Sequence, residues 1–127
     1  MTADPHAFQP LLDRFGRGWE LGKTEDIVGV FTPDAVLIPD PHEGPVRGHD
    51  AIRAYWKDLP FTQAEIRFRA GEIFRAGPWF AAEFKVTFRR RRTGEPVDVR
   101  GAMCCETRDG LIGEMRLYWQ RRVGTRA

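Results

Sequence analysis

Apolar residues recur at helical spacing near the start of the chain. Between residues 8 and 19 they lie three or four positions apart, so they fall on one face of an α-helix. The dipeptide Asp4-Pro5 suits the start of this helix, because a carboxylate can cap free N–H groups and proline needs none. Gly22 suits its end. The apolar positions are Phe8, Leu11, Leu12, Phe15 and Trp19.

Two further helices are predicted before residue 60. Thr24 suits the cap of a short second helix, which should extend to Phe31 and be ended by Pro33. A third helix should begin near His49 and stop before Pro60, since proline cannot supply the N–H of an interior position. In chain order the pattern predicts a helix from 24, a strand over 35–38, a proline-rich loop over 39–45 and a helix from 49.

After residue 60 the period of the pattern becomes two. Apolar residues alternate with polar residues in four stretches, which is typical of half-buried β-strands. Segments 93–95 and 108–110 have turn composition, so neighbouring strands should pair antiparallel in chain order. The alternating apolar positions are Ile66, Phe68 and Ala70; Phe84, Val86 and Phe88; Val97, Val99, Gly101 and Met103; and Met115, Leu117 and Trp119.

Three helices followed by four long strands predict an α+β domain, in which the helices cover one face of a curved, mostly antiparallel sheet. The first and third helices carry wide aromatic side chains, Trp19 and Trp56 among them, which hold a helix away from a sheet. We therefore expect a mostly apolar internal pocket between the two layers. The length of 127 residues fits a single domain over 1–127.

Composition narrows the classes of function. The chain is 42% hydrophobic and 30% charged, which is ordinary for a globular protein. A net charge of +2 gives no nucleic-acid footprint, and the four arginines of 89–92 would alternate between strand faces. No segment approaches the roughly 18 apolar residues of a membrane span, and the first residues lack the pattern of a secretory signal. We expect a cytoplasmic protein that binds neither nucleic acid nor membrane.

The two cysteines, Cys104 and Cys105, are adjacent in the chain. A bridge between them would be strained and would close almost no loop, so they form no disulfide framework. On a strand they would point to opposite faces. Without a second cysteine or a histidine cluster they also make a poor zinc site, and the sequence indicates no metal and no cofactor.

Several local motifs are shared with one large family. They are Trp19, the run Val30-Phe31-Thr32-Pro33-Asp34-Ala35, the run Gly48-His49-Asp50-Ala51-Ile52-Arg53-Ala54-Tyr55-Trp56, and the ending from Asp109-Gly110 to Leu117-Tyr118-Trp119. With these motifs and this order of elements, nearly the whole chain resembles the nuclear transport factor 2-like superfamily, which includes ketosteroid isomerase and the SnoaL-type polyketide cyclases. The resemblance implies a cone-shaped fold with a pocket between helices and sheet, and a homodimer joined through sheet surfaces.

Asp40 is the candidate catalytic residue. The segment around it resembles ketosteroid isomerase, whose matching aspartate moves a proton next to a carbonyl. At the rim of an apolar cavity an aspartate is desolvated and becomes a better base near neutral pH, and His42 is a candidate partner. The two oxyanion donors of that enzyme match Phe15 and either Ala102 or Met103 here. Neither can donate a hydrogen bond, so steroid isomerisation itself is not expected.

Two main hypotheses about function remain. The chain is either a general acid/base enzyme of isomerase, cyclase or hydratase type acting through Asp40, or a non-catalytic ligand-binding or dimeric accessory module in which Asp40 only orients its loop. A third hypothesis uses Asp98 and Arg100, which resemble the water-activating site of limonene epoxide hydrolase. The first two hypotheses expect a small apolar molecule in an aromatic pocket formed by Phe15, Trp19, Tyr55, Trp56, Phe61 and Trp119.

Overall fold

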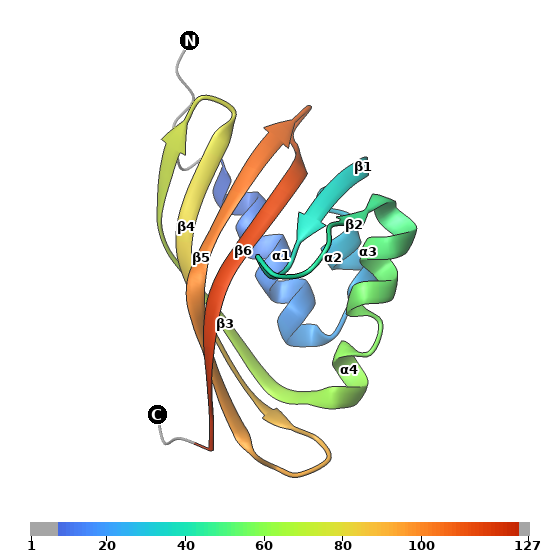
Figure 1. Ribbon diagram of the computed structural model, residues 1–127, viewed down its shortest axis with the longest axis vertical. Helices are drawn as coiled ribbons and strands as arrows, with labels where there is room; N and C mark the ends of the chain where they lie inside the picture. The colour runs from blue at the N-terminus through green and yellow to red at the C-terminus, as the bar shows by residue number, and fades with distance from the viewer. Residues whose placement is uncertain (1–7, 125–127) are drawn as a thin grey trace.

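The computed structural model describes residues 8–124, in which four helices lie against one face of a six-stranded sheet (Figure 1). The helices are α1 (Gln9–Leu21), α2 (Thr24–Val28), α3 (Gly48–Trp56) and α4 (Leu59–Thr62). The strands are β1 (Phe31–Ile38), β2 (Val46–Arg47), β3 (Gln63–Ala76), β4 (Trp79–Arg90), β5 (Pro96–Arg108) and β6 (Leu111–Val123). The predicted α+β architecture is confirmed. The predicted helix start at Asp4-Pro5 lies outside the described residues.

The strands are ordered β2-β1-β6-β5-β4-β3 across the sheet. From β3 to β6 each strand pairs antiparallel with the next one in the chain, and the two predicted turn segments join β4 to β5 and β5 to β6. In the β5–β6 turn, Asp109 and Gly110 have φ angles of 53° and 79°, the left-handed conformation that suits a tight hairpin. The sequence did not predict that β1 pairs parallel with β6, because parallel pairing leaves no turn signal.

The second helix is shorter and the first strand longer than predicted. α2 spans five residues, the chain is extended from Phe31, and Pro33 lies inside β1 instead of ending a helix. Phe31 pairs with Ile112 of β6, so a long-range partner overrides the local helical pattern. Thr24 is the first helical residue and not the cap. Its hydroxyl donates to the carbonyl oxygen of Trp56 at 3.4 Å, which joins α2 to the end of α3.

The third predicted helix is divided in two. α3 ends at Trp56, and α4 begins at Leu59 with Pro60 in its first turn. Proline is favourable at that position because first-turn N–H groups have no partner within the helix. Pro60 therefore lies in the first turn of a helix where the sequence was expected to end one. His49 lies in the first turn of α3, with its Nε2 atom 2.9 Å from the carbonyl oxygen of Phe31.

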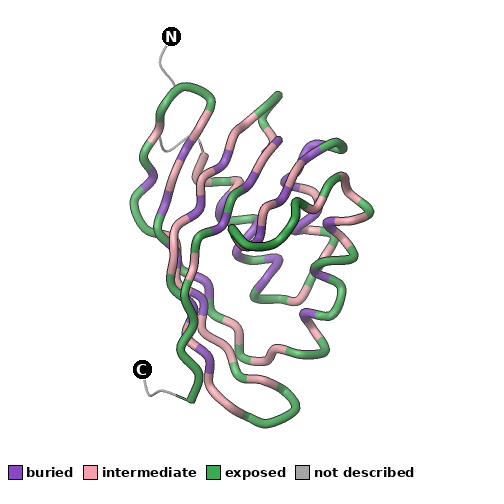
Figure 2. The backbone as a smooth tube through the Cα atoms, in the orientation of Figure 1, coloured by how far each residue is buried: buried purple, intermediate pink, exposed green. Residues whose placement is uncertain are grey.

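The core lies between the helices and the side toward which the sheet curves, here called the inner face (Figures 1 and 2). Alternate residues of the long strands are buried on this face, as period-two patterning requires. Phe15 of α1 is fully buried, and its ring centroid lies 5.9 Å from that of Trp19 and 5.8 Å from those of Trp56 and Phe68. This aromatic cluster joins α1 and α3 to β3.

Gly101 allows β5 and β6 to approach closely. A Cβ atom at this position would meet the carbonyl oxygen of Tyr118 and would lie 2.7 Å from the Cα atom of Trp119. Both contacts are with backbone, which cannot move aside as a flexible side chain can. Glycine is therefore required for the spacing of the two strands beside Trp119.

Candidate functional site

A cavity of about 250 Å³ lies between the helices and the inner face of the sheet. Its volume is slightly below the roughly 300–1,000 Å³ usual for ligand pockets, so it suits a small molecule. Most of its wall is aromatic or aliphatic, from Trp19, Tyr55, Trp56, Leu59, Phe84, Phe88, Val99, Leu117 and Trp119. The polar residues of the wall are Asp58, Thr62, Gln63 and Arg121.

The deep wall of the cavity is apolar and closed to solvent. Trp19 and Trp56 are 8% and 5% exposed, and their ring centroids lie 4.8 Å apart. Phe84 and Leu117 are buried on the sheet side. Aromatic walls of this kind favour a flat, apolar molecule, because ring faces and edges pack closely against such a surface.

Three tryptophans line the cavity, and two of their indole N–H groups are engaged. Trp19 Nε1 donates to Oε1 of Gln63 at 3.0 Å, and Trp119 Nε1 donates to the carbonyl oxygen of Pro39 at 2.6 Å. Within residues 8–124 the buried N–H of Trp56 has no hydrogen-bond partner. Leaving a buried donor unpaired costs about 1–3 kcal/mol. Because this nitrogen also has almost no accessible surface, Trp56 contributes its ring to the cavity wall.

The cavity opens beside four exposed residues, Tyr55, Asp58, Thr62 and Arg121. Partial burial of the phenol raises the pKa of Tyr55, and the negative charges of Glu43 and Asp40 raise it further. Tyr55 is therefore neutral at physiological pH and able to donate a hydrogen bond. Asp58 and Arg121 bring opposite charges to the mouth.

The structure brings together four of the six aromatic residues predicted for a pocket, Trp19, Tyr55, Trp56 and Trp119. Phe15 does not line the cavity, because it is fully buried behind this wall in the aromatic cluster. Phe61 is 76% exposed and does not line it either. The start of a new helix at Leu59 turns Leu59 inward in its place.

Asp40 follows β1 and does not line the cavity. Its Oδ1 atom accepts a hydrogen bond of 2.8 Å from the backbone N–H of His42, and its carbonyl oxygen accepts one of 3.0 Å from the N–H of Glu43. Both bonds are typical of an aspartate that shapes a turn. Asp40 and His42 are thus adjacent to each other, and Pro39, which precedes Asp40, accepts the N–H of Trp119 in the cavity wall.

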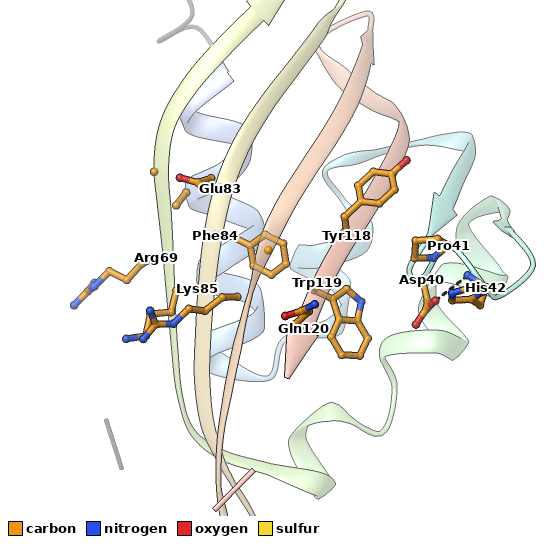
Figure 3. A pocket seen from close by; sticks show the side chains of 14 residues that line it. Asp40, Pro41, His42, Arg69, Glu83, Phe84, Lys85, Tyr118, Trp119 and Gln120 are labelled. Carbon is orange, nitrogen blue, oxygen red and sulfur yellow. Dashed lines mark hydrogen bonds between the residues drawn. The ribbon is translucent and has the colours of Figure 1, made fainter. Parts of the chain in front are cut away.

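A larger and shallower depression, about 940 Å³, lies on the opposite, outer face of the sheet, with Asp40 and His42 at one end (Figure 3). More than half of its lining residues are exposed, and the charged ones among them carry both signs. It therefore lacks the apolar enclosure of a small-molecule site. The strand side chains that line it include Arg69, Glu83, Lys85, Arg100, Tyr118 and Gln120.

Asp98 and Arg100 also lie away from the cavity. The Nε and Nη2 atoms of Arg100 each donate to a carboxylate oxygen of Asp98 at 3.2 Å. This pairing lowers the pKa of Asp98, and the charges of Lys85 and Arg122 lower it further. The arrangement is an ion pair on the outer face, with no enclosed space in which to hold an epoxide.

The register of β5 decides which residue matches the second oxyanion donor. Met103 pairs with Leu117 and is fully buried on the inner face, so Ala102 points outward. The inner positions that correspond to the two donors are thus Phe15 and Met103, and neither side chain donates a hydrogen bond.

Sequence reasoning missed Asp58, Gln63 and Arg121 as residues of the cavity wall. Asp58 and Gln63 flank α4, whose separate existence the sequence did not predict. Arg121 did leave a signal, because it follows Leu117 and Trp119 at the same period of two and breaks their apolar row.

Cys104 and Cys105 are free thiols, and burial raises the pKa of Cys105. Over residues 8–124, no group of three His, Cys, Asp or Glu side chains is arranged to hold a metal ion. None of the helices in that range is long and apolar enough to cross a membrane.

Comparison with known proteins gives a family match. The sequence model of the SnoaL-like domain matches residues 12–115. No curated protein matches the chain in sequence.

Solved structures give the same fold at low sequence identity. A "putative isomerase" from Bacillus subtilis has a TM-score of 0.81 and 24% identity, covering 93% of this chain and 90% of the other. SalBIII, an epoxide hydrolase/cyclase-like enzyme in pyran ring formation of the polyether salinomycin, has a TM-score of 0.79 and 20% identity, over 92% and 93%. A computationally designed 17-OHP binder has a TM-score of 0.78 and 18% identity, over 96% and 100%. At these identities the likeness establishes the fold alone.

Proposed function

This chain belongs to the SnoaL-like domain family, and we propose that it binds a small apolar molecule in the cavity between its helices and its sheet. The observation that carries the proposal is the aromatic wall, to which Trp19, Trp56 and Trp119 contribute from α1, α3 and β6. A molecule that covers this wall gains about 25 cal/mol for each Å² of apolar surface removed from water.

The names of two relatives are consistent with such a site. The designed binder takes a small molecule on this fold, and SalBIII is described as a cyclase-like enzyme. The same scaffold therefore serves binding as well as catalysis, and the choice for this chain rests on its own residues. The side chains of its cavity wall favour binding.

Catalysis by Asp40 is the second candidate, with His42 as its partner. It is favoured by the effect of Asp40 and Glu43 on the pKa of Tyr55, which brings both carboxylates within electrostatic reach of the cavity mouth. To act on a bound molecule, Asp40 would have to give up its hydrogen bond to the His42 backbone and turn toward Tyr55. Binding without catalysis needs no such rearrangement, so we prefer it.

Binding is tested with an uncharged bicyclic probe, methyl 2-naphthylacetate, titrated by calorimetry and by ligand-observed NMR. We expect saturable binding that is weakened at least tenfold by Val99→Phe, because the larger ring fills the cavity wall. Ala102→Phe, which points outward from the same strand, is the matched control and should bind as the wild type does. Equal affinity of the two variants would exclude the cavity as the site.

Catalysis is tested separately by following exchange of the probe's methylene protons for deuterium, the proton transfer that a general base would perform. If the protein binds without catalysis, it does not raise the exchange rate above that of the buffer, and Asp40→Asn leaves probe affinity unchanged. Exchange that the wild type accelerates and Asp40→Asn abolishes would replace the binding proposal with the enzyme proposal.

We further propose that the outer face of the sheet joins two copies of the chain. Its depression mixes cationic residues such as Lys85 with acidic residues such as Glu83, so two copies can pair opposite charges. Light scattering should give the mass of a dimer, and Tyr118→Glu in the depression should shift it toward monomer. Monomer at every concentration would refute the pairing.

A further inference from the structure

We infer that the molecule bound in the cavity carries a carboxylate, which Arg121 binds at the cavity mouth. This inference rests on the proposed function, since it adds one charged group to the apolar ligand. It assigns a specificity role to a residue outside the motifs that the sequence analysis singled out.

The first argument is the position of Arg121 on β6. Met115, Leu117 and Trp119 face inward at alternate positions, and Arg121 takes the next inward position. Its partner across the sheet is Val99, which is 9% exposed and lines the same cavity. A cation in an apolar row has no cross-strand partner of opposite charge there, so the sheet itself gains nothing from its charge.

The second argument is the pairing of arginines elsewhere in the fold. Six of the sixteen arginines in residues 8–124 have a carboxylate oxygen within 3.7 Å, namely Arg53, Arg89, Arg90, Arg100, Arg108 and Arg116, and Arg121 is among the ten that do not. Within residues 8–124, Arg121 has no carboxylate at that distance and no hydrogen bond from its guanidinium. All five N–H donors of that group are therefore available at the mouth.

The adjacent residue makes the contrast clear. Arg122 points to the outer face, opposite Asp98, and its charge contributes to lowering the pKa of that carboxyl group. Arg122 thus has an electrostatic partner within the protein, whereas Arg121 lines the cavity. Two arginines that differ by one position in the chain lie on opposite faces of the sheet.

The acidic residue of the cavity wall is Asp58. Asp58 and Arg121 form no ion pair in the described part of the chain, so Asp58 does not neutralise the guanidinium. Its negative charge would repel a bound carboxylate. Replacing Asp58 with a neutral residue should therefore strengthen the binding of an acid.

The class of ligand follows from the shape and charge of the site. A single arginine lines the cavity, which suits a planar, singly charged group that accepts two parallel N–H bonds, and a carboxylate has this geometry. The closed aromatic end takes the apolar body. With about 250 Å³ available, the body has the size of one or two fused rings.

The experiment compares 2-naphthylacetic acid with its methyl ester at pH 7, by calorimetry, on the wild type and three variants. We expect the acid to bind the wild type about five- to tenfold more tightly than the ester, the range for a charged hydrogen bond that is partly exposed. Arg121→Gln should remove this preference. Arg122→Gln should keep the preference, and Asp58→Asn should increase it. Thermal unfolding of each variant checks that it is folded.

The outcomes separate the inference from the function beneath it. If the ester and the acid bind the wild type equally, or if Arg122→Gln removes the preference as fully as Arg121→Gln, the inference is wrong and the cavity function stands. If neither probe binds the folded wild type, the cavity function fails and the inference fails with it.

Discussion

The two faces of the same sheet differ in chemistry although they share every strand. On β5, Val99 and Met103 point inward and are buried among apolar side chains, while Asp98 and Arg100 point outward and form an ion pair. On β6, Leu117 lines the cavity and its outward neighbours are charged or polar. Period-two alternation therefore sorts one continuous stretch of sequence into two surfaces with separate roles.

The difference teaches where each kind of perturbation should act. The inner face has few titratable groups and depends on packing. Changes of side-chain volume and bound ligands should therefore alter the stability of the protein mainly at this face. The outer face carries ion pairs in a polar setting, so changes of pH and of charge should be felt there. Variants at adjacent positions of one strand separate the two effects.

The largest difference in stability is expected between variants at two neighbouring positions of β5. Met103→Ala removes a fully buried side chain on the inner face and should lower the free energy of unfolding by about 2–5 kcal/mol. Cys104→Ala changes a half-buried outer side chain and should cost less than about 1 kcal/mol. Urea denaturation measures both. Similar losses for the two variants would mean that the faces do not differ in packing.

The next comparison is between the stabilities of two glycine-to-alanine variants. Gly101→Ala should destabilise the protein by about 1–3 kcal/mol, because the new methyl group meets the backbone of β6 beside Trp119. Gly71→Ala is the control, since its Cβ would lie at an ordinary 3.5 Å from the carbonyl oxygen of Glu83. We expect Gly71→Ala to be neutral or slightly stabilising. A tolerated Gly101→Ala would show that the strands can separate freely there.

The outer ion pair should give a smaller effect that depends on pH. The pKa of Asp98 is lower in the folded protein than in the unfolded chain, so its contribution is present above the unfolded pKa and is lost as pH falls through the folded pKa. Asp98→Asn should therefore be less stable than the wild type by up to about 1 kcal/mol at pH 7, and the gap should close in acid. Arg100→Gln should weaken the same pH dependence. A gap that is constant from pH 7 to pH 2 would contradict the ion-pair account.

The smallest expected effect is a change in the pKa of Tyr55, which lies at the cavity mouth. The chain has two tyrosines, and ultraviolet absorbance of the wild type and of Tyr55→Phe isolates the titration of Tyr55. We expect its pKa to lie above the usual value of about 10, and Asp40→Asn to bring it down slightly by removing a negative charge. Asp109→Asn at the distant β5–β6 turn should leave it unchanged. No response to Asp40→Asn would place that carboxylate too far from the cavity mouth to act there.

Local patterns were sufficient for most of the fold. The stripe from Phe8 to Trp19 predicted α1, and alternation together with turn composition predicted the antiparallel meander of the long strands. The pattern failed where a distant partner decides the conformation. Phe31 belongs to a strand because Ile112 pairs with it. Pro60 lies in the first turn of α4 because α3 has already ended at Trp56. The family resemblance is confirmed by the SnoaL-like match.

The candidate site could be predicted only in part. Helical spacing was enough to bring Trp19, Tyr55 and Trp56 to the cavity, because each helix presents one face to the sheet. The same spacing could not separate the wall from the layer behind it, where Phe15 lies. The position of Asp40 depends on a loop turn, and side-chain hydrogen bonding within such a turn cannot be deduced from a motif alone.

The parallel pairing of β1 with β6 also has a consequence for how the chain folds. Strands β3 to β6 can form by successive hairpins between neighbours, which requires only local closure. β1 must wait for β6, because Phe31 and Ile112 are joined across most of the sequence. The slow, entropically costly step should therefore be docking of β1 onto a preformed meander, and a chain interrupted before β6 would leave β1 without that partner strand.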